Sequence, residues 1–297
     1  MSPVFLAGPT AVGKSSVALR LAELLGGEII SVDSMQVYRG LDIGTSKPTA
    51  AERARVPHHL LDVADLDQPF DAARFVVLAR AAVADLTKRG KRPIFCGGTG
   101  LYFRAYLEGL GDAPPANPAL RAELEAAPLE QLLRELEQRD PATFARIDRA
   151  NPRRVVRAVE VIRLTGKPFS AQRAGWEETP PPEFFFCLQR EPADLRARID
   201  ARVDAMFAAG LVDETRALLA RGLEKNRTAM QAIGYRQVVE HLRGERSLAE
   251  TIDLVKTKTR QYAKRQLTWF RAQPGVQWLE PDTNLDTTAD QLAARVG

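Results

Sequence analysis

The stretch that decides the fold is Gly8-Pro9-Thr10-Ala11-Val12-Gly13-Lys14-Ser15, near the amino terminus. An apolar run at residues 4–7 precedes it, and a helix-like pattern of valine, alanine and leucine follows. A strand, a glycine-rich loop and a helix in this order are the setting of a phosphate-binding P-loop. The loop N–H groups and the positive end of the helix surround a phosphate. We therefore predict a di- or triphosphate site in which Lys14 contacts the outer oxygens and Ser15 holds Mg²⁺.

Size and composition indicate an ordinary globular protein of 297 residues, 45% hydrophobic and 27% charged. Residues 1–7 lack the basic start and long apolar middle of a signal peptide, and no apolar run is long enough to span a membrane. We expect a cytoplasmic protein without membrane contact. Cys96 and Cys187 are expected to be free thiols, neither a disulfide nor a zinc site. The net charge of +4 argues only weakly for nucleic acid.

Strand and helix patterns alternate along the first part of the chain. Residues 28–32 and 92–98 have the pattern of buried strands, and residues 71–89 have that of a helix. The phenylalanine-rich run at residues 183–189 predicts a strand that returns to the same sheet. This order predicts an α/β fold, a P-loop NTPase-like core with a central parallel sheet flanked by helices.

Two polar residues follow predicted strands directly. Asp33 comes after residues 28–32, and Thr99 comes after the strand that ends in a second glycine turn. Ligands of open α/β sheets bind at the carboxyl ends of strands, so both residues are expected to face the P-loop. Each is also a residue type that commonly caps a helix or a turn. The adjacent His58 and His59 favour a structural or substrate-loop role, because neighbouring side chains do not share a face for a metal.

An all-helical insertion is predicted between two proline-rich stretches. The pairs Asn117-Pro118 and Asn151-Pro152 are helix start signals, and no strand pattern lies between residues 117 and 182. Helices are expected at residues 118–126, 128–138, 141–147 and 152–165. The predicted domains are therefore a P-loop core of residues 1–116 and 183–297 and a helical insertion domain of residues 117–182, which ends in prolines at 179–182.

Two predicted helices are strongly basic. The helix at residues 152–165, with its flank, carries Arg153, Arg154, Arg157, Arg163 and Lys167. The helix at residues 247–273 carries Lys256, Lys258, Arg260, Lys264, Arg265 and Arg271, interleaved with Tyr262, Trp269 and Phe270. Basic patches with aromatic residues are typical of nucleic-acid contact, whereas a basic helix face alone is commonly just solvated. Together, the two helices would suit the gripping of one nucleic-acid strand.

Several classes of phosphate-binding protein fit poorly. The chain has neither the Asn-Lys-x-Asp nor the Asp-x-x-Gly motif of GTPases. It also lacks the acidic pair at the end of an apolar strand that helicases and ATPases use. A small-molecule kinase that binds ATP stays an alternative, since it shares the loop and the core. Such a kinase would not need a helical insertion bearing an arginine cluster.

Six motifs then occur in the order and spacing of one family. They are Gly8 to Ser15, Asp33-Ser34-Met35-Gln36-Val37-Tyr38-Arg39, Pro57-His58-His59-Leu60, Gly97-Gly98-Thr99-Gly100-Leu101-Tyr102, Ile233-Gly234-Tyr235-Arg236 and Lys264-Arg265-Gln266-Leu267-Thr268-Trp269. From end to end, the chain resembles the tRNA dimethylallyltransferases, also called tRNA isopentenyltransferases. It lacks the C-terminal zinc-finger extension of the extended eukaryotic members, so it is similar to the compact bacterial type.

The resemblance implies transfer of a dimethylallyl group from dimethylallyl diphosphate to N6 of adenine 37 in tRNA. The P-loop and Mg²⁺ would then bind a leaving diphosphate, Asp33 would be the general base and Thr99 would assist the leaving oxygen. Arg202, favoured over Arg198 by position, would clamp the diphosphate. A monomer is expected. The stretches that match tRNA contacts of the family comprise Asp33, Ser34, Met35, Gln36, Arg121, Arg153, Arg154, Val155, Val156, Arg157, Gln231, Gly234, Tyr235, Arg236, Lys264, Arg265, Trp269 and Arg271.

Overall fold

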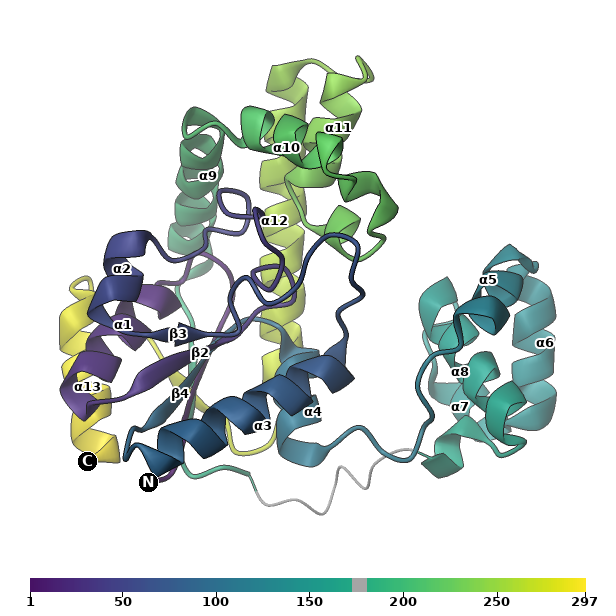
Figure 1. Cartoon of the computed structure of the whole chain (residues 1–297), viewed down its shortest axis with the longest axis horizontal. Coiled ribbons are helices and arrows are strands. Elements are labelled where there is room, and N and C mark those ends of the chain that lie inside the picture. Colours follow the sequence, from purple (N-terminus) through teal and green to yellow (C-terminus); the bar gives the residue numbers. More distant parts are fainter. Residues whose placement is uncertain (173–180) are drawn as a thin grey trace. The chain divides into compact units, whose positions relative to one another are not determined.

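The computed structural model describes residues 1–172 and 181–297. The chain forms two compact units, one made of Met1–Tyr106 with Pro181–Gly297 and the other of Leu107–Pro180. The first unit contains the sheet and is called the core unit below. The second contains only helices among its described residues and is called the helical unit (Figure 1).

The core unit is built on one six-stranded, all-parallel sheet with the order β3-β2-β4-β1-β5-β6. The strands are β1 (Val4–Ala7), β2 (Glu28–Val32), β3 (His58–His59), β4 (Pro93–Gly97), β5 (Phe185–Leu188) and β6 (Gln277–Leu279). The predicted parallel sheet is confirmed, including the return of the chain to it at β5. The P-loop strand β1 lies between β4 and β5, so the loop that follows it lies at the middle of the sheet's carboxyl edge.

Helices pack on both faces of this sheet. The helices of the core unit are α1 (Lys14–Leu25), α2 (Ala50–Arg55), α3 (Ala72–Lys88), α4 (Gly100–Glu108), α9 (Pro192–Ala208), α10 (Leu211–Ala220), α11 (Tyr235–Leu242), α12 (Leu248–Arg271) and α13 (Leu285–Val296). Of these, α10 and α11 pack on each other and on α9 and α12. Short 3-10 turns occupy Leu223–Lys225 and Ala229–Gln231.

Alternate residues of β1 serve the two faces, as the period of two in a strand requires. Val4 and Leu6 join a fully apolar cluster with residues of α1 and α13. Phe5 points the other way and stacks on Phe95, with ring centroids 4.8 Å apart, and contacts Phe103 of α4 edge-on. Because both faces are covered, the sheet presents its carboxyl edge as the place where a polar ligand can bind.

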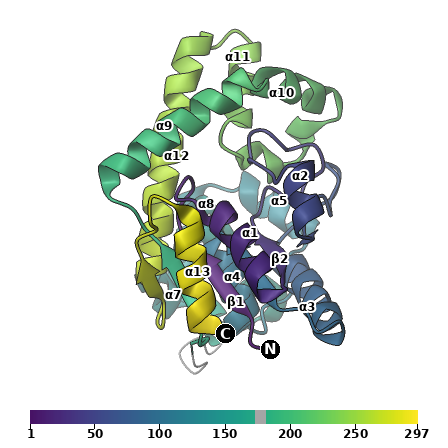
Figure 2. The same ribbon diagram turned by 90° about the vertical axis from the view of Figure 1, so that its left-hand side faces the viewer.

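Helix α13 is an element that the sequence analysis does not predict. It packs along α1, as Figure 2 shows, and buries Ala289, Leu292 and Val296 in the apolar cluster beneath. Asn284 caps it by accepting a hydrogen bond from the N–H of Asp286 at 3.0 Å. The cap and the spacing of apolar residues were readable from the sequence, so the signal was present but not used.

The paired histidines form the edge strand β3. His59 Nε2 is hydrogen-bonded with the Glu28 carboxylate at 2.7 Å, and His58 Nδ1 with the Val56 carbonyl at 2.7 Å. Both rings therefore have structural partners, which agrees with the structural role that the sequence favours for them. Arg89 also pairs with Glu28, and this hydrogen bond lowers the pKa of the Glu28 carboxyl to about 2.

The helical unit consists of α5 (Pro118–Ala126), α6 (Leu129–Arg139), α7 (Pro141–Arg146), α8 (Pro152–Thr165) and a 3-10 turn at Phe169–Gln172. Asn117 and Asn151 cap α5 and α8, as their sequence pattern predicts. The unit begins at Leu107, before the expected boundary at residue 117, because the linker packs against it. Arg157 donates to the Pro114 carbonyl at 2.6 Å, and the Asp112 N–H donates to the Gln172 carbonyl. Part of the predicted proline hinge, Thr179 and Pro180, lies outside the described residues.

Two composition-based expectations are also answered by the structure. Cys96 and Cys187 are both free thiols, and burial raises the pKa of Cys96 to about 11 and that of Cys187 to about 12. Across residues 1–172 and 181–297, every helix is too short or too polar to cross a lipid bilayer.

Candidate active site

The P-loop leaves the start of α1 open to an anion. Gly13 takes a left-handed conformation with φ 108° and precedes α1 without a side-chain cap, so no side chain at this position occupies the first N–H groups of the helix. Gly8 lies so close to β5 that a Cβ there would be 2.7 Å from the Leu188 carbonyl oxygen. Lys14 Nζ donates to the Pro9 carbonyl at 2.6 Å across the loop. The pKa of Lys14 is lowered to about 8, mainly by burial, and the positive charge of Arg202 acts in the same direction.

Asp33 and Thr99 meet at the carboxyl edge of the sheet, as predicted. Asp33 Oδ1 accepts hydrogen bonds from the N–H groups of Met35 at 2.8 Å and Gln36 at 3.2 Å. Thr99, which precedes α4, accepts a hydrogen bond on Oγ1 from the Ser34 N–H at 3.1 Å. One carboxylate oxygen of Asp33 caps the turn and thereby fixes the direction of the other oxygen. The turn-capping role is therefore compatible with the predicted role of Asp33 in the site.

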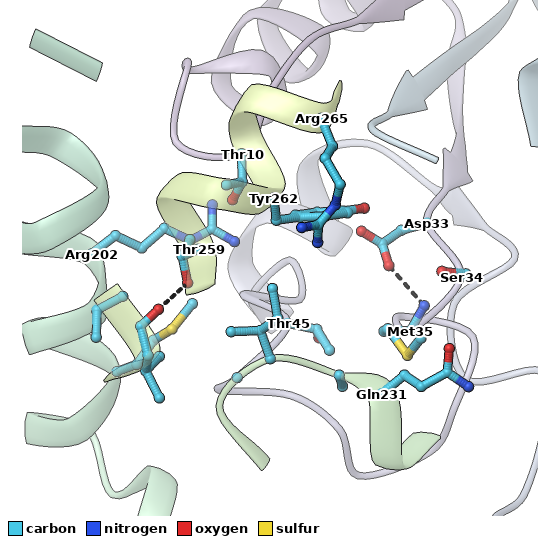
Figure 3. A pocket seen from close by; sticks show the side chains of 16 residues that line it. Thr10, Asp33, Ser34, Met35, Thr45, Arg202, Gln231, Thr259, Tyr262 and Arg265 are labelled. Carbon is cyan, nitrogen blue, oxygen red and sulfur yellow. Dashed lines mark hydrogen bonds between the residues drawn. The ribbon is translucent and has the colours of Figure 1, made fainter. Parts of the chain in front are cut away.

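A cavity of about 330 Å³ lies beside these residues within the core unit. Asp33 lines it from one side and Arg202 of α9 from the other, with the Tyr262 ring of α12 between them (Figure 3). Thr10 of the P-loop and Arg265 of α12 complete the polar part of its wall. The cavity thus brings together the phosphate loop, a carboxylate and a cation.

The structure distinguishes Arg202 from Arg198. Arg202 lines the cavity, and its Nε is buried with no hydrogen-bond partner among the described residues. Burial lowers the pKa of its guanidinium, while the Asp33 carboxylate acts in the opposite direction. Arg198 instead forms an ion pair with Asp194 on the same helix, with Nε 3.0 Å from Oδ1. Of the two candidates, only Arg202 has an unsatisfied donor beside the P-loop.

Helix α12 contributes two residues, Tyr262 and Gln266, that the sequence analysis does not assign to the catalytic or diphosphate site. Tyr262 presents its ring to the cavity, with the Arg265 guanidinium 5.7 Å from the ring centroid. Gln266, one turn later, is bonded to the P-loop and to the second glycine turn. Their spacing of four residues places both on one face of the helix. This face was not recognised in the sequence because many charged residues lie between and around the two. Phe270 is a fully buried core residue and is not available for contact with nucleic acid.

The predicted tRNA-contacting residues of the core unit fall into three groups. Ser34, Met35 and Gln231 line the cavity with Asp33 and Arg265. Gln36 lies beside it and donates through Nε2 to the Thr45 carbonyl at 3.1 Å. The exposed group is Arg236, Lys264 and Arg271, and Trp269 is half-buried against Gly100.

Gly234 and Tyr235 form the third group, and both are buried, so the Tyr235 ring is not exposed for contact with tRNA. Gly234 is buried, and its N–H donates to Gln237 Oε1 at the start of α11. The Tyr235 hydroxyl donates to the Glu214 carboxylate at 2.6 Å and accepts from the Gly44 N–H at 3.1 Å. Tyr235 therefore supports the loop at Gly44, and Gly234 forms the start of α11.

In the helical unit the basic surface of α8 is narrower than expected. Arg153 and Arg154 are exposed. Val155 and Val156 lie in the hydrophobic core of this unit, so the expectation that their side chains contact tRNA is wrong. Arg157 and Arg121 both pair with the fully buried Glu160, at 2.7 and 2.5 Å. These two arginines neutralise a buried carboxylate and therefore have a structural role.

A metal at the P-loop would have few protein ligands. Residues 1–172 and 181–297 contain no cluster of three or more His, Cys, Asp or Glu side chains suited to a metal ion. The exposed Ser15 hydroxyl at the start of α1 is the ligand that the loop itself offers. This donor set fits Mg²⁺, which usually keeps several waters and shares its remaining positions with substrate phosphates.

Comparison with known proteins gives a consistent answer over nearly the full chain. The chain is 50% identical over 288 residues to tRNA dimethylallyltransferase 1 of Trichlorobacter lovleyi, covering 95% of this chain and 94% of that one. Its fold matches the tRNA isopentenylpyrophosphate transferase of Bacillus halodurans, with a TM-score of 0.72, 39% identity and coverage of 99% and 96%. It also matches a eukaryotic dimethylallyltransferase acting on tRNA, with a TM-score of 0.81, 30% identity and coverage of 98% and 77%. The profile of the IPP transferase family matches residues 36–273, and the chain therefore belongs to this family.

Proposed function

We propose that the protein transfers a dimethylallyl group from dimethylallyl diphosphate to N6 of adenine 37 in tRNA, releasing diphosphate and forming N6-(dimethylallyl)adenosine. The observation that carries the proposal is the cavity in which Asp33 and Arg202 face each other beside the P-loop. It offers a proton acceptor to the amine and positive charge to the diphosphate. Family membership supports the same reaction.

The P-loop holds the diphosphate as a leaving group in this proposal. Its N–H groups, Lys14 and the Arg202 guanidinium neutralise the charge that develops as the bond between the allylic carbon and oxygen breaks. Thr99 donates its hydroxyl proton toward the departing oxygen. The Ser15 hydroxyl would hold Mg²⁺, which when bound would further stabilise the same charge.

Asp33 is the general base. Its Oδ1 is occupied by the N–H groups of Met35 and Gln36, so Oδ2 accepts the N6–H of the adenine. N6 uses its lone pair to form the new bond to the allylic carbon, and the proton that it loses passes to Asp33. Positioned proton transfer of this kind contributes about 10²–10⁴-fold to the rate.

Asp33 lines a cavity, so the adenine has to leave its stack to reach this carboxylate. The exposed basic residues of the two units would bind the tRNA backbone, with Arg154 in the helical unit and Arg236, Lys264 and Arg271 in the core unit. One chain contains Lys14, Asp33, Thr99 and Arg202, so a monomer is sufficient for the chemistry. We expect it to act in the cytoplasm, where tRNA is abundant.

The test is an incubation of the protein with dimethylallyl diphosphate, labelled in the allyl group, and unmodified tRNA. Label is expected in the tRNA, with one diphosphate released for each label incorporated. The same tRNA with guanine at position 37 is the control and should stay unlabelled. ATP consumption without label transfer would instead support the kinase alternative and refute the proposal.

A further inference from the structure

Gln266 is the buried residue that joins the two halves of the site. It lies on α12, and its side chain reaches between the P-loop and the glycine turn that follows β4. Its Oε1 accepts a hydrogen bond from the Thr10 N–H at 2.9 Å, and its Nε2 donates to the Gly98 carbonyl at 3.0 Å. Only 6% of the residue is exposed.

The fit of this amide is close. A Cβ at Gly98 would overlap with Gln266 Nε2, so residue 98 has to be glycine while the amide is in place. The Thr10 N–H needs an acceptor and the Gly98 carbonyl needs a donor. Glutamine supplies both at this length, whereas ionised glutamate supplies only acceptors and methionine supplies neither. The site is therefore specific for an amide and does not simply demand a side chain of the right size.

The bridge continues to the reacting groups. Gly98 is followed by Thr99, whose N–H donates to the Val32 carbonyl at 3.2 Å and whose Oγ1 accepts from Ser34. Val32 and Ser34 flank Asp33 in the sequence. A continuous run of hydrogen bonds thus connects the P-loop, through Gln266 and Thr99, to the turn that carries Asp33. The Tyr262 hydroxyl interacts with the side chains of Thr99 and Gln266 at the same point.

We propose that Gln266 is a positioning residue that sets the distance between the diphosphate cradle and the pair Thr99 and Asp33. The inference rests on the proposed function, because it assigns these groups to leaving-group and base roles. Loss of the bridge would let the two turns shift while tRNA still binds through exposed residues. A misplacement of reacting groups by about 1 Å lowers the rate about 10²-fold.

Two substitutions test this. Gln266→Met keeps the length and removes both hydrogen bonds, so kcat should fall by about 10²-fold while the Kd for tRNA stays within about twofold. Gln172→Met is the matched control, since Gln172 is equally buried at 6% exposed and donates to three acceptors of the helical unit. It should lower Tm to a similar extent and leave kcat unchanged. A Gln266→Met protein with lowered Tm and unchanged kcat would overturn the proposal.

Gln266→Glu supplies a second, independent readout. A protonated carboxyl has one donor and one acceptor, so it can rebuild the bridge, and burial raises the pKa of such a carboxyl. The ratio of kcat in Q266E to kcat in the unchanged protein should therefore rise as the pH falls from about 8.5 to about 6. A flat ratio would overturn the proposal even if Gln266→Met failed to fold. If the unchanged protein transfers no label to tRNA, the proposed function itself is wrong, which is a separate outcome.

Discussion

Replacement of Arg202 by glutamine should weaken the binding of dimethylallyl diphosphate without affecting tRNA. The buried Nε of Arg202 has no partner among the described residues, and the side chain lines the cavity at the P-loop. A bound diphosphate would satisfy at least this one donor. Hydrogen bonds to charged groups are worth about 1.5–3 kcal/mol, and each 1.4 kcal/mol corresponds to a factor of ten. The Kd for dimethylallyl diphosphate should thus rise about 10- to 150-fold.

Arg198→Gln is the matched control because it removes the same charge from the same helix. Arg198 already has a partner in Asp194, and the pair is partly exposed, so its loss should change stability by less than about 1 kcal/mol. The Kd for the diphosphate should stay within about twofold in this variant. Isothermal titration calorimetry with dimethylallyl diphosphate, in the absence of tRNA, measures both values.

The comparison can fail in two informative ways. A Kd in Arg202→Gln within about threefold of the unchanged protein would mean that the buried guanidinium does not contact the diphosphate. A larger effect in Arg198→Gln would mean that α9 presents the other arginine to the ligand. Arg202→Gln should also raise the pKa of Lys14, because the charge of Arg202 is one of the causes that lower it.

Three further outcomes are expected. Asp33→Asn keeps an oxygen to cap the turn, so kcat should fall at least about 10²-fold with tRNA affinity intact, and single-turnover rates that fall less than tenfold would refute the base assignment. Arg154→Ala should reduce the slope of log Kd for tRNA against log salt by about 1, whereas Arg157→Ala should mainly lower Tm, because the buried Glu160 then loses one of its ion-pair partners. Equal slopes in the unchanged protein and both variants would exclude Arg154 from the tRNA contact. Lys14 is charged below its pKa of about 8, so the diphosphate should bind with full affinity there and lose affinity as the pH rises above 8, with proton uptake detected by calorimetry in two buffers.

The sequence was most informative where structure is determined locally. The P-loop stretch, the four α-helices of the helical unit and the strands β1, β2, β4 and β5 are carried by short patterns and were predicted, whereas the edge strand β3 was not. Gln266 could not be recognised as part of the site in this way, because it bonds to Thr10 over a separation of 256 residues. No local pattern indicates that one side chain will reach two glycine turns that lie far from it in the sequence.

The errors have a related cause. Val155 and Val156 were assigned to a tRNA-contacting stretch as consecutive residues, although neighbouring residues on a helix point in different directions. The structure places both valines in the core, beside arginines that face solvent. Tyr235 was assigned from its motif, and its hydroxyl is bonded to Glu214. A motif therefore identifies the stretch that matters, while the direction of each side chain has to come from the fold.

The identity of the P-loop ligand likewise depends on the residues that the fold brings near the loop, and not on the motif alone. In the proposed function the loop would hold the phosphate oxygens, and any molecule that carries a diphosphate would satisfy it. What narrows the choice is the wall opposite, where Arg202 adds a second cation and Asp33 adds an acceptor within one cavity. Cations and a carboxylate together suit a reaction in which one partner leaves as an anion and the other gives up a proton. Transfer of an allyl group from a diphosphate to an amine meets both demands at once, and the amide of Gln266 connects the groups that meet them.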